Sequence, residues 1–486
     1  MFESGKASTR DLERLVAALS GFEDAADDAE RVTQLDLLER VKAACAAAQA
    51  RVTVELAESQ AALAEEWRQS ARTAAAVGDF DAWRAAREAM RRSSCPEADD
   101  EPRGSVEAGR RPRGRRPRAE LGVAAQVALA RRESPHTGSR LVRFAFALTH
   151  EMPFLLSLLE RGVVSERRAL LVVQECAALT REQHERVDAE LRHTVGEQLG
   201  RMSAAELTSR VRAITYRLDA QAVVDRAAYA ERERRVTLRP APDTMCWLTA
   251  LLPATQGVGV LAALTQAADA ARAAGDTRGR GQVMADTLVE RVTGQASAAG
   301  VSVEVQVVLT DRALLAGDAT PAVVPGYGTV PAEWARRMVR REPEGPVQVW
   351  IRRLYTHPDN GALVAMDSRR RVFDGSLRRL LVARDGGIRR TPGCGAPIRH
   401  VDHVTPHAAG GATASRNGQG LCVRCNLVKE LLGWWARVAG GGEAHTVEIT
   451  TPTGHRYRSN APPVVHEDPG ISASALERVI EHALAA

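Results

Sequence analysis

The sequence predicts a mostly α-helical protein with α+β parts. Segments rich in Ala, Leu and Arg dominate the chain, while aromatic residues make up only 4% of it. Alternating, strand-like segments follow only after about residue 235. With 486 residues, the chain is long enough for two or three domains and a large buried core.

Residues 1–92 are expected to form a helical N-terminal region. Small and apolar residues recur there at spacings of three and four, at Leu38, Val41, Cys45, Ala48, Val52 and Leu56. This spacing predicts a buried helical seam like that of a coiled-coil pair. Cys45 is then a small core residue rather than a ligand. Such helices could also join copies of the chain, so a homo-oligomer is a further expectation.

Residues 93–118 are expected to form an Arg/Pro-rich linker. The prolines of residues 109–118 (GRRPRGRRPR) exclude a continuous helix, and the like charges repel one another. The segment is interpreted as disordered, either as a linker alone or as a linker that also tethers nucleic acid electrostatically.

Residues 119–383 are expected to form a mixed middle region. Apolar residues fall on one face of a first helix at Leu155, Leu158 and Leu159, and of a second at Leu170, Val173 and Cys176. Extended segments are predicted at 236–243 and 302–310. A hairpin over 348–355 and 363–367 turns at Asn360-Gly361, and a short helix is predicted at 376–383.

Residues 384–437 form a separate predicted cassette, and residues 438–486 a C-terminal hairpin and tail. Strands are predicted at 445–450 and 455–458 around a Pro-Thr-Gly turn, and a helix at 473–484. The cassette is basic, with five more positive than negative residues, an excess as large as that of the whole chain. The positive residues are Arg384, Arg389, Arg390, Arg399, Arg416, Arg424, Lys429 and Arg437. A basic surface suits a phosphate backbone such as that of DNA, and the alternative is a solvated basic face.

Seven cysteines in so long a chain do not predict a disulfide framework. Three of them lie within the cassette, at Cys394, Cys422 and Cys425. No signal-peptide pattern and no uncharged apolar run of membrane-spanning length is recognisable. The expectation is therefore a reducing, cytoplasmic setting without a membrane.

Three chemically distinct features fall within the cassette. The first is Asp402-His403, at the end of a short apolar stretch. The second is Asn417, inside a Gly-rich loop, where Asn readily bonds to nearby backbone. The third is residues 422–429 (CVRCNLVK), which are expected to begin a helix.

These residues suit phosphodiester hydrolysis, which needs a base for the attacking water and a cation for the developing charge. A neutral His403 can act as the base. Asp402 and Asn426 offer oxygen ligands for Mg²⁺ or Mn²⁺, and Glu430, four residues after Asn426, could complete the shell. Neighbours on a regular strand point to opposite faces, so Asp402 and His403 can share a site only at a strand end or a bulge.

The cassette resembles the HNH endonuclease family, whose pattern is Asp-His, Gly-Gly, Asn and Cys-x-x-Cys-Asn-x-x-Lys. The chain matches it at Asp402, His403, Gly410, Gly411, Asn417, Cys422, Cys425, Asn426 and Lys429. The resemblance implies a ββα-metal fold that cuts DNA and leaves a 3′-hydroxyl and a 5′-phosphate. It implies His403 as general base, Asp402 and Asn426 as metal ligands, and Asn417 as the residue that shapes the loop and orients the base.

One position departs from the family pattern. Many such cassettes carry four cysteines that hold a structural Zn²⁺, but Arg389 stands where a partner of Cys394 is expected. Cys394, Cys422 and Cys425 remain as zinc ligands, with His400 or His407 as the only near candidates for a fourth. The alternative is three partly buried free thiols.

Residues from about 119 to 384 resemble the family called domain of unknown function 222, which commonly precedes an HNH cassette. The resemblance rests on residues 128–136 (ALARRESPH), 280–292 (RGQVMADTLVERV) and 354–357 (LYTH). It supplies an association but no mechanism.

The sequence therefore predicts a metal-dependent DNA endonuclease with a C-terminal HNH cassette. The alternative is a non-catalytic DNA-binding protein with a degenerate HNH cassette. A third hypothesis treats residues 1–118 as an oligomerisation arm and the whole chain as a scaffold.

Overall fold

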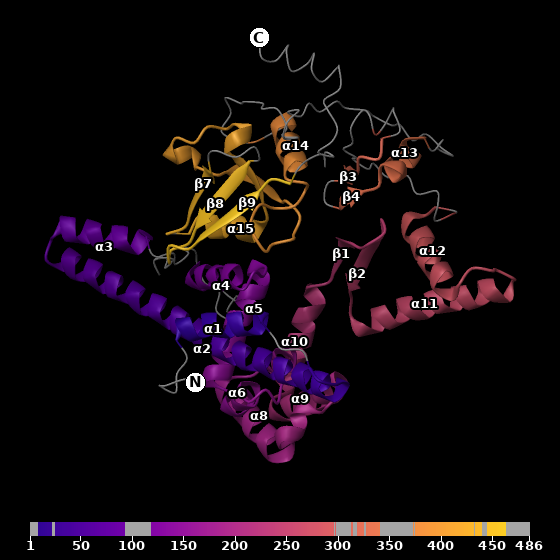
Figure 1. The fold of residues 1–486 in the computed structure, drawn as a ribbon, viewed down its shortest axis with the longest axis horizontal. Coiled ribbons are helices and arrows are strands. Elements are labelled where there is room, and N and C mark those ends of the chain that lie inside the picture. The colour runs from indigo at the N-terminus through magenta and orange to yellow at the C-terminus, as the bar shows by residue number, and fades with distance from the viewer. Residues whose placement is uncertain are drawn as a thin grey trace, which may run out of the picture. The chain divides into compact units, whose positions relative to one another are not determined.

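The computed structural model describes residues 8–21, 25–92, 118–295, 297, 313, 318–324, 327–340, 373, 375–431, 433–439 and 445–462 (Figure 1). The predicted linker up to residue 117, the strand at 302–310, the hairpin over 348–367 and the tail helix at 473–484 lie outside them. By packing, the chain divides into two compact units. One combines Met1–Glu55 with Arg143–Val223, and the other combines Leu56–Val142 with Val224–Ala486.

The N-terminal region is helical, as the sequence predicts. It contains α1 (Thr9–Ser20), α2 (Asp28–Ala76) and α3 (Phe80–Arg92). Ser8 caps α1 in a capping box with Asp11, which satisfies backbone N–H groups at the start of the helix. Gly78, at a φ of +71°, makes the turn from α2 into α3.

The predicted seam of α2 is wrong in its register. Ala48 and Val52 are exposed, and the other four seam residues are only partly buried. The buried residues in this stretch are Ala43, Ala46, Ala47, Ala50, Thr53 and Val54. These are mostly alanines, whose small side chains allow the backbone of α2 to approach its neighbours closely. Gly162 illustrates this closeness, because a Cβ there would lie 2.5 Å from the Cβ of Arg40.

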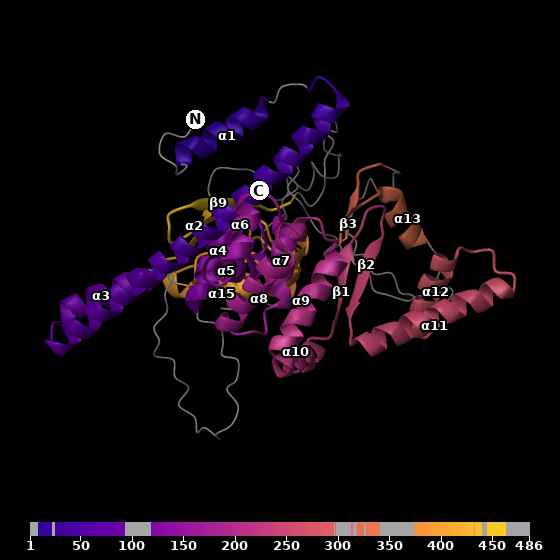
Figure 2. The same ribbon diagram turned by 90° about the horizontal axis from the view of Figure 1, so that it is seen from below.

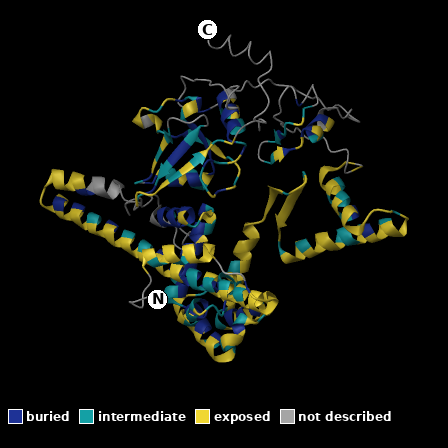
Figure 3. Ribbon diagram, in the orientation of Figure 1, coloured by how far each residue is buried: buried dark blue, intermediate teal, exposed yellow. Residues whose placement is uncertain are grey.

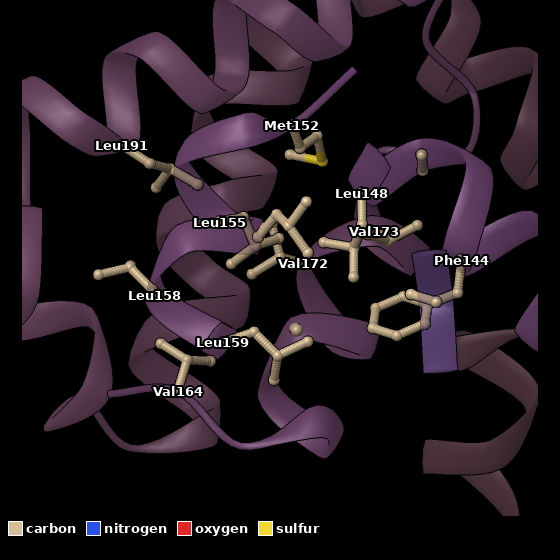
Figure 4. Packing of buried hydrophobic residues seen from close by; sticks show 14 of the residues in the cluster. Phe144, Leu148, Met152, Leu155, Leu158, Leu159, Val164, Val172, Val173 and Leu191 are labelled. Atoms are coloured by element: carbon tan, nitrogen blue, oxygen red, sulfur yellow. The ribbon is translucent and has the colours of Figure 1, made fainter. Parts of the chain in front are cut away.

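The core of the first unit is built from short helices rich in Leu and Val (Figure 4). They are α6 (Pro153–Glu160), α7 (Glu166–Glu175), α8 (Arg181–Thr194) and α9 (Ala204–Leu218), with the 3₁₀ turn η1 (Gly196–Gly200). Leu155, Leu158 and Leu159 are completely buried on α6, which confirms the predicted apolar face. Capping boxes begin α8 and α9.

The helices α4 (Arg118–Ala130) and α5 (Pro135–His150) precede α6 in the chain. Among the described residues, no single helix is long and apolar enough to cross a membrane. The helices α5 and α6 pass such a test of length and composition only as a pair bent by 105°.

The middle region of the second unit carries little buried surface (Figure 3). After α10 (Ala220–Arg232), β1 (Arg235–Pro240) pairs antiparallel with β2 (Cys246–Leu251). The extended segment predicted at 236–243 is confirmed over residues 236–240 in β1, and Asp243 lies in a turn. β2 was not predicted, because its mainly apolar run lacks alternation. The helices α11 (Ala254–Ala273) and α12 (Arg280–Thr293) lie side by side (Figures 1 and 2).

Short elements lead to the C-terminal part. β3 (Ala322–Val324) and β4 (Gly328–Val330) form a hairpin before α13 (Ala332–Arg340). The helix α14 (Gly375–Arg384) confirms the prediction at 376–383. Its apolar residues Leu377, Leu380 and Leu381 pack with Phe373 in a small buried cluster.

The C-terminal part contains two small antiparallel sheets. One pairs β5 (His400–His403) with β6 (Gly418–Leu421), and α15 (Val423–Lys429) follows directly. The other has the order β7-β8-β9, from β7 (Trp435–Ala439), β8 (Thr446–Thr450) and β9 (Arg456–Asn460). The predicted C-terminal hairpin is thus confirmed as β8 and β9, and the end of the predicted cassette adds β7 to it.

Candidate active site

The candidate site lies at one end of the sheet formed by β5 and β6 and on the helix α15 that follows it. The antiparallel register places His403 opposite Gly418 and Asp402 opposite Gln419. A Cβ at Gly418 would lie 2.5 Å from Leu381 of α14, so a side chain has no room there. Cys422 caps α15, because its Sγ accepts a hydrogen bond from the backbone N–H of Cys425 at 3.3 Å.

Asp402 and His403 share one site because His403 is the last residue of β5. Oδ1 of Asp402 accepts a hydrogen bond from the backbone N–H of His403 at 2.8 Å and lies 3.6 Å from its Nδ1. Neighbouring residues inside a regular strand point to opposite faces, but at this strand end both side chains can belong to one site, as expected from the sequence.

The imidazole of His403 is buried and held in one orientation. Its Nε2 lies 2.9 Å from the hydroxyl oxygen of Thr413, and its ring centroid lies 4.6 Å from that of Phe373. Burial lowers the pKa of His403 below its ordinary value of 6.5, although the Asp402 carboxylate opposes this shift. The ring is therefore neutral near pH 7. If Nε2–H donates to Thr413, Nδ1 is left as the proton acceptor beside Asp402.

Asp402 is ionised and paired with Lys429. The Nζ of Lys429 lies 2.9 Å from Oδ2 of Asp402, 2.9 Å from Oε1 of Glu430 and 2.9 Å from the backbone carbonyl oxygen of His403. Burial opposes ionisation of Asp402, but the hydrogen bonds from Lys429 and from the His403 N–H outweigh it and lower the pKa of the carboxyl. Glu430 contacts this lysine on a more exposed side of the site.

Asn417 holds the loop between β5 and β6. Its Oδ1 accepts from the backbone N–H of Thr405, and its Nδ2 donates to the carbonyl oxygens of Thr405 and Ala412, each at 2.9 Å. The loop is tight at Gly411, where a Cβ would lie 1.9 Å from the Thr405 carbonyl oxygen. These bonds shape the loop. The side chain that hydrogen-bonds to the His403 ring, however, is Thr413, which the sequence did not predict.

Asn426 of α15 offers an oxygen that no residue in the described part of the chain satisfies. Its Oδ1 is buried and has no hydrogen-bond partner. A buried acceptor without a donor costs free energy, unless a bound group that is not part of the chain satisfies it. A hard divalent cation would suit such an oxygen. In the described part of the chain, no three His, Cys, Asp or Glu side chains group together as a metal site by themselves.

The three cassette cysteines form one buried cluster. Cys394, Cys422 and Cys425 are each at most 8% exposed and pack together with Leu421. Hydrogen bonding from Cys425 lowers the pKa of the Cys422 thiol, and the same bond raises that of Cys425. Arg389, whose Nε donates to the Cys394 carbonyl oxygen at 3.2 Å, also stabilises the Cys422 thiolate.

The surroundings of these thiols do not fit a tetrahedral zinc site. A fourth ligand is missing among the described residues, because His400 is exposed and the His407 ring lies beside that of His403, 5.7 Å between centroids. The guanidinium of Arg389, close enough to act on both Cys422 and Cys425, brings a positive charge that would repel a zinc ion.

Two arginines counted with the basic surface are buried instead. Arg384 and Arg390 are 6% and 2% exposed, and both bond to the buried Asp385. Arg384 also donates to the carbonyl oxygens of Ser415 and Gly418, and the other Asp385 oxygen accepts from the Gly420 N–H. This network ties α14 to β6. The predicted basic surface is therefore smaller than the charge count suggests, with Arg399 and Arg416 among its exposed members.

Comparison with known families agrees with this arrangement. The model of the HNH endonuclease family matches residues 392–430, which contain β5, β6 and α15. The model of a second family, "Domain of unknown function (DUF222)", matches residues 105–385. No curated protein and no solved structure was found to match the chain.

The fold and the site thus define a protein with a C-terminal HNH endonuclease domain, a class that acts as nucleases with divalent metal ions. The second match covers more than half of the 486 residues, so the chain belongs to the family Domain of unknown function (DUF222).

Proposed function

We propose that the chain is a metal-dependent DNA endonuclease whose general base is His403. One observation carries the proposal. A buried, neutral imidazole ends β5 with Nδ1 3.6 Å from Asp402, and Asn426 on the helix packed against this sheet has an unsatisfied oxygen. A base beside one hard oxygen ligand, with a second such oxygen on the adjoining helix, suits metal-assisted phosphodiester hydrolysis.

His403 takes the proton of the attacking water in this proposal. The hydrogen bond between Nε2 and the Thr413 hydroxyl holds the ring in one orientation, in which Nδ1 lies on the Asp402 side of the site. As Nδ1 gains the proton, the ring becomes positive, and the neighbouring Asp402 carboxylate stabilises that charge. The loop that carries Thr413 is held in turn by Asn417.

Asp402 and Asn426 would hold one Mg²⁺ or Mn²⁺. The cation, when bound, supplies positive charge for the phosphate and the leaving oxygen. The Asp402 carboxylate is charged at neutral pH, because hydrogen bonds from the Lys429 ammonium and the His403 N–H lower its pKa. Exposed Arg399 and Arg416 are candidates to neutralise phosphates of the DNA backbone.

Nicking of supercoiled plasmid in Mg²⁺ or Mn²⁺ tests the proposal. We expect the parent protein to convert plasmid to the nicked or linear form, and EDTA to stop the reaction. His403→Ala should lose at least about a hundredfold in rate, as expected for removal of a general base. His455→Ala, which removes an exposed histidine outside the site, is the matched control. Equal cleavage by His403→Ala and the parent would overturn the assignment.

The second candidate function is DNA binding without cleavage. Two observations favour it: the thiol cluster does not fit a zinc site, and the Lys429 ammonium already pairs with Asp402. The same plasmid can distinguish the two functions. A protein that binds DNA with strong salt dependence, yet leaves it intact in both Mg²⁺ and Mn²⁺, belongs to this second class.

A further inference from the structure

The helix α4 packs directly onto the candidate nuclease cassette. Ala125 and Leu129, one helical turn apart on α4, share a buried cluster with three residues that lie about 300 positions later in the chain. Those residues are Val428, Leu431 and Trp434, and each of the five side chains is at most 9% exposed. Both segments belong to the same compact unit.

Two further contacts join the same segments. Gly393 lies against the turn that follows α4, so that a Cβ there would come within 2.9 Å of the Glu133 carbonyl oxygen. Its φ of +73° also favours glycine. At the start of α5, the hydroxyl of Ser139 accepts a hydrogen bond from the guanidinium of Arg424 on α15. The interface thus combines apolar packing, a close backbone approach and a polar bond.

The composition of α4 explains why it needs such a partner. Residues 122–129 are all buried, and an α-helix with buried residues on every side is a core helix rather than a surface helix. α2 contacts α4 through two hydrogen bonds between the side-chain amides of Gln60 and Gln126, at 3.2 and 3.3 Å. The cassette covers Ala125 and Leu129. Without the cassette, this apolar face would be exposed to water.

The interface is linked to the candidate active site through α15. Val428 packs against α4, while the next residue, Lys429, bonds to Asp402 and to the His403 carbonyl oxygen. A small apolar cavity at this interface is lined by Ala125 and Leu129, and also by Lys429 and Gln419. Both Lys429 and Gln419 donate to the His403 carbonyl oxygen. A shift of α15 on α4 therefore moves groups that hold the end of β5.

We propose that α4 is a docking helix for the nuclease cassette, so that this part of the region of unknown function holds α15 in its working position. That the position of α15 matters for DNA cleavage rests on the proposed function. The packing of α4 against the cassette does not depend on it. The role gives a physical reason for the two regions to occur in one chain, because the cassette completes its core with a helix that the preceding region supplies.

Hydrogen exchange of the full chain, followed by mass spectrometry on peptides, tests this role. Ala125→Arg places a charge in the buried cluster, and Ala130→Arg is the matched control, because Ala130 is exposed on the same helix. We expect exchange in residues 418–431 to become about tenfold faster or more in Ala125→Arg and to stay at the parent rate in Ala130→Arg. Exchange in α8, which belongs to the other compact unit, reports whether the rest of the chain remains folded.

Milder variants keep the test decisive if Ala125→Arg unfolds the whole chain. Leu129→Ala should accelerate exchange in residues 418–431, and the reciprocal change Trp434→Ala should accelerate exchange in α4, because coupling between two packed segments acts in both directions. Parent-like exchange in both cases would overturn the proposal. These readouts need no nuclease activity. If His403→Ala and the parent cleave alike but the exchange changes appear, the proposed function fails and the docking role stands.

Discussion

The ammonium of Lys429 lies 2.9 Å from Oδ2 of Asp402, the carboxylate that the proposed function assigns to the metal. Its other contacts, to the His403 carbonyl oxygen and to Glu430, account for the remaining two N–H groups of the ammonium. A divalent cation bound by Asp402 would therefore share this carboxylate with a fixed positive charge, and the two charges would repel each other.

Removal of that charge is expected to tighten metal binding. In Lys429→Met, half-maximal nicking should need several-fold less Mg²⁺ than in the parent, because the competing ammonium is gone. The free energy of unfolding should fall by about 1–3 kcal/mol, since Asp402 and the His403 carbonyl oxygen lose a buried donor. A Mg²⁺ titration of the nicking rate and a urea unfolding curve measure the two effects.

Lys429→Arg is the control, because it keeps the positive charge. It should need at least as much Mg²⁺ as the parent. If Lys429→Met instead requires more Mg²⁺ than the parent, the lysine supports the metal site rather than competing with it.

Thr413 is expected to act as a positioning residue for His403. In Thr413→Val, which keeps the shape of the side chain but removes the hydroxyl, Nε2 loses its partner and the ring loses the hydrogen bond that holds its orientation. We expect about a tenfold lower nicking rate. Thr413→Ser restores the hydroxyl and should recover most of the rate.

A purely structural role for Thr413 would give a different pattern. If only the fold depended on it, the stability would fall while the dependence of the rate on pH stayed as in the parent. We expect instead that the acid limb of the rate profile of Thr413→Val moves, because its midpoint reports the protonation of His403.

The dependence of the parent protein's nicking rate on pH follows from the direction of the His403 pKa shift. Burial lowers the pKa of His403 below 6.5, and the base works only when neutral. The nicking rate should therefore rise with pH, reach half its maximum below pH 6.5 and be nearly constant from pH 7 to 8. Rates measured at fixed free Mg²⁺ between pH 5 and 8 check this, and a midpoint above 7 would contradict a buried neutral base.

The parts of the site that the sequence could predict are those set by local chain geometry. Asp402 and His403 are neighbours, and Asn417 bonds within its own loop, so the motif itself constrains them. Thr413 escaped notice because only the folded loop brings its hydroxyl to the ring. Charge counting misplaced Arg384 and Arg390, because composition does not show that the buried Asp385 binds both.

The fold, too, could be predicted only in part, because contacts between distant segments do not show in the local sequence. Spacings of three and four in α2 fit more than one helical face, and only the neighbouring helices decide that Ala47 and Ala50 are buried while Val52 is exposed. The contact between α4 and α15 joins segments about 300 positions apart. Periodicity shows that α4 is apolar but not which segment covers it.

We predict that the chain binds no structural zinc and that Arg389 is the reason. Arg389→Cys removes the guanidinium beside the thiols and supplies a fourth sulfur to Cys394, Cys422 and Cys425, a ligand set that suits zinc. Elemental analysis of the purified proteins should find about one zinc per chain in Arg389→Cys and almost none in the parent.

The double variant Arg389→Cys/Cys394→Ser tests whether the gained metal uses the predicted site. It lacks one of the four sulfurs and should lose most of the zinc. If the parent itself carries one zinc per chain, the interpretation of Arg389 is wrong.

His445 is expected to make the folded state sensitive to mild acid. Its Nδ1 accepts a hydrogen bond from Nη1 of Arg390 at 3.1 Å, and its Nε2 lies 2.8 Å from the Arg416 carbonyl oxygen, to which it donates. A proton added to Nδ1 would point at the N–H group of Arg390, so this hydrogen bond would be lost. Burial and the nearby charges of Arg384 and Arg390 lower the pKa of His445 to about 4, from an ordinary 6.5.

The sign of the effect on stability follows from these two pKa values. Between pH 6.5 and 4 the unfolded chain binds more protons at this residue than the folded chain, so the free energy of unfolding falls as the pH falls. The loss from this one group is about 3 kcal/mol at most. His445→Gln keeps a donor and an acceptor but does not titrate. Urea unfolding at pH 7.5 and pH 5 should therefore show a smaller loss of stability in His445→Gln than in the parent. Equal losses in the two proteins would mean that protonation of His445 does not oppose folding.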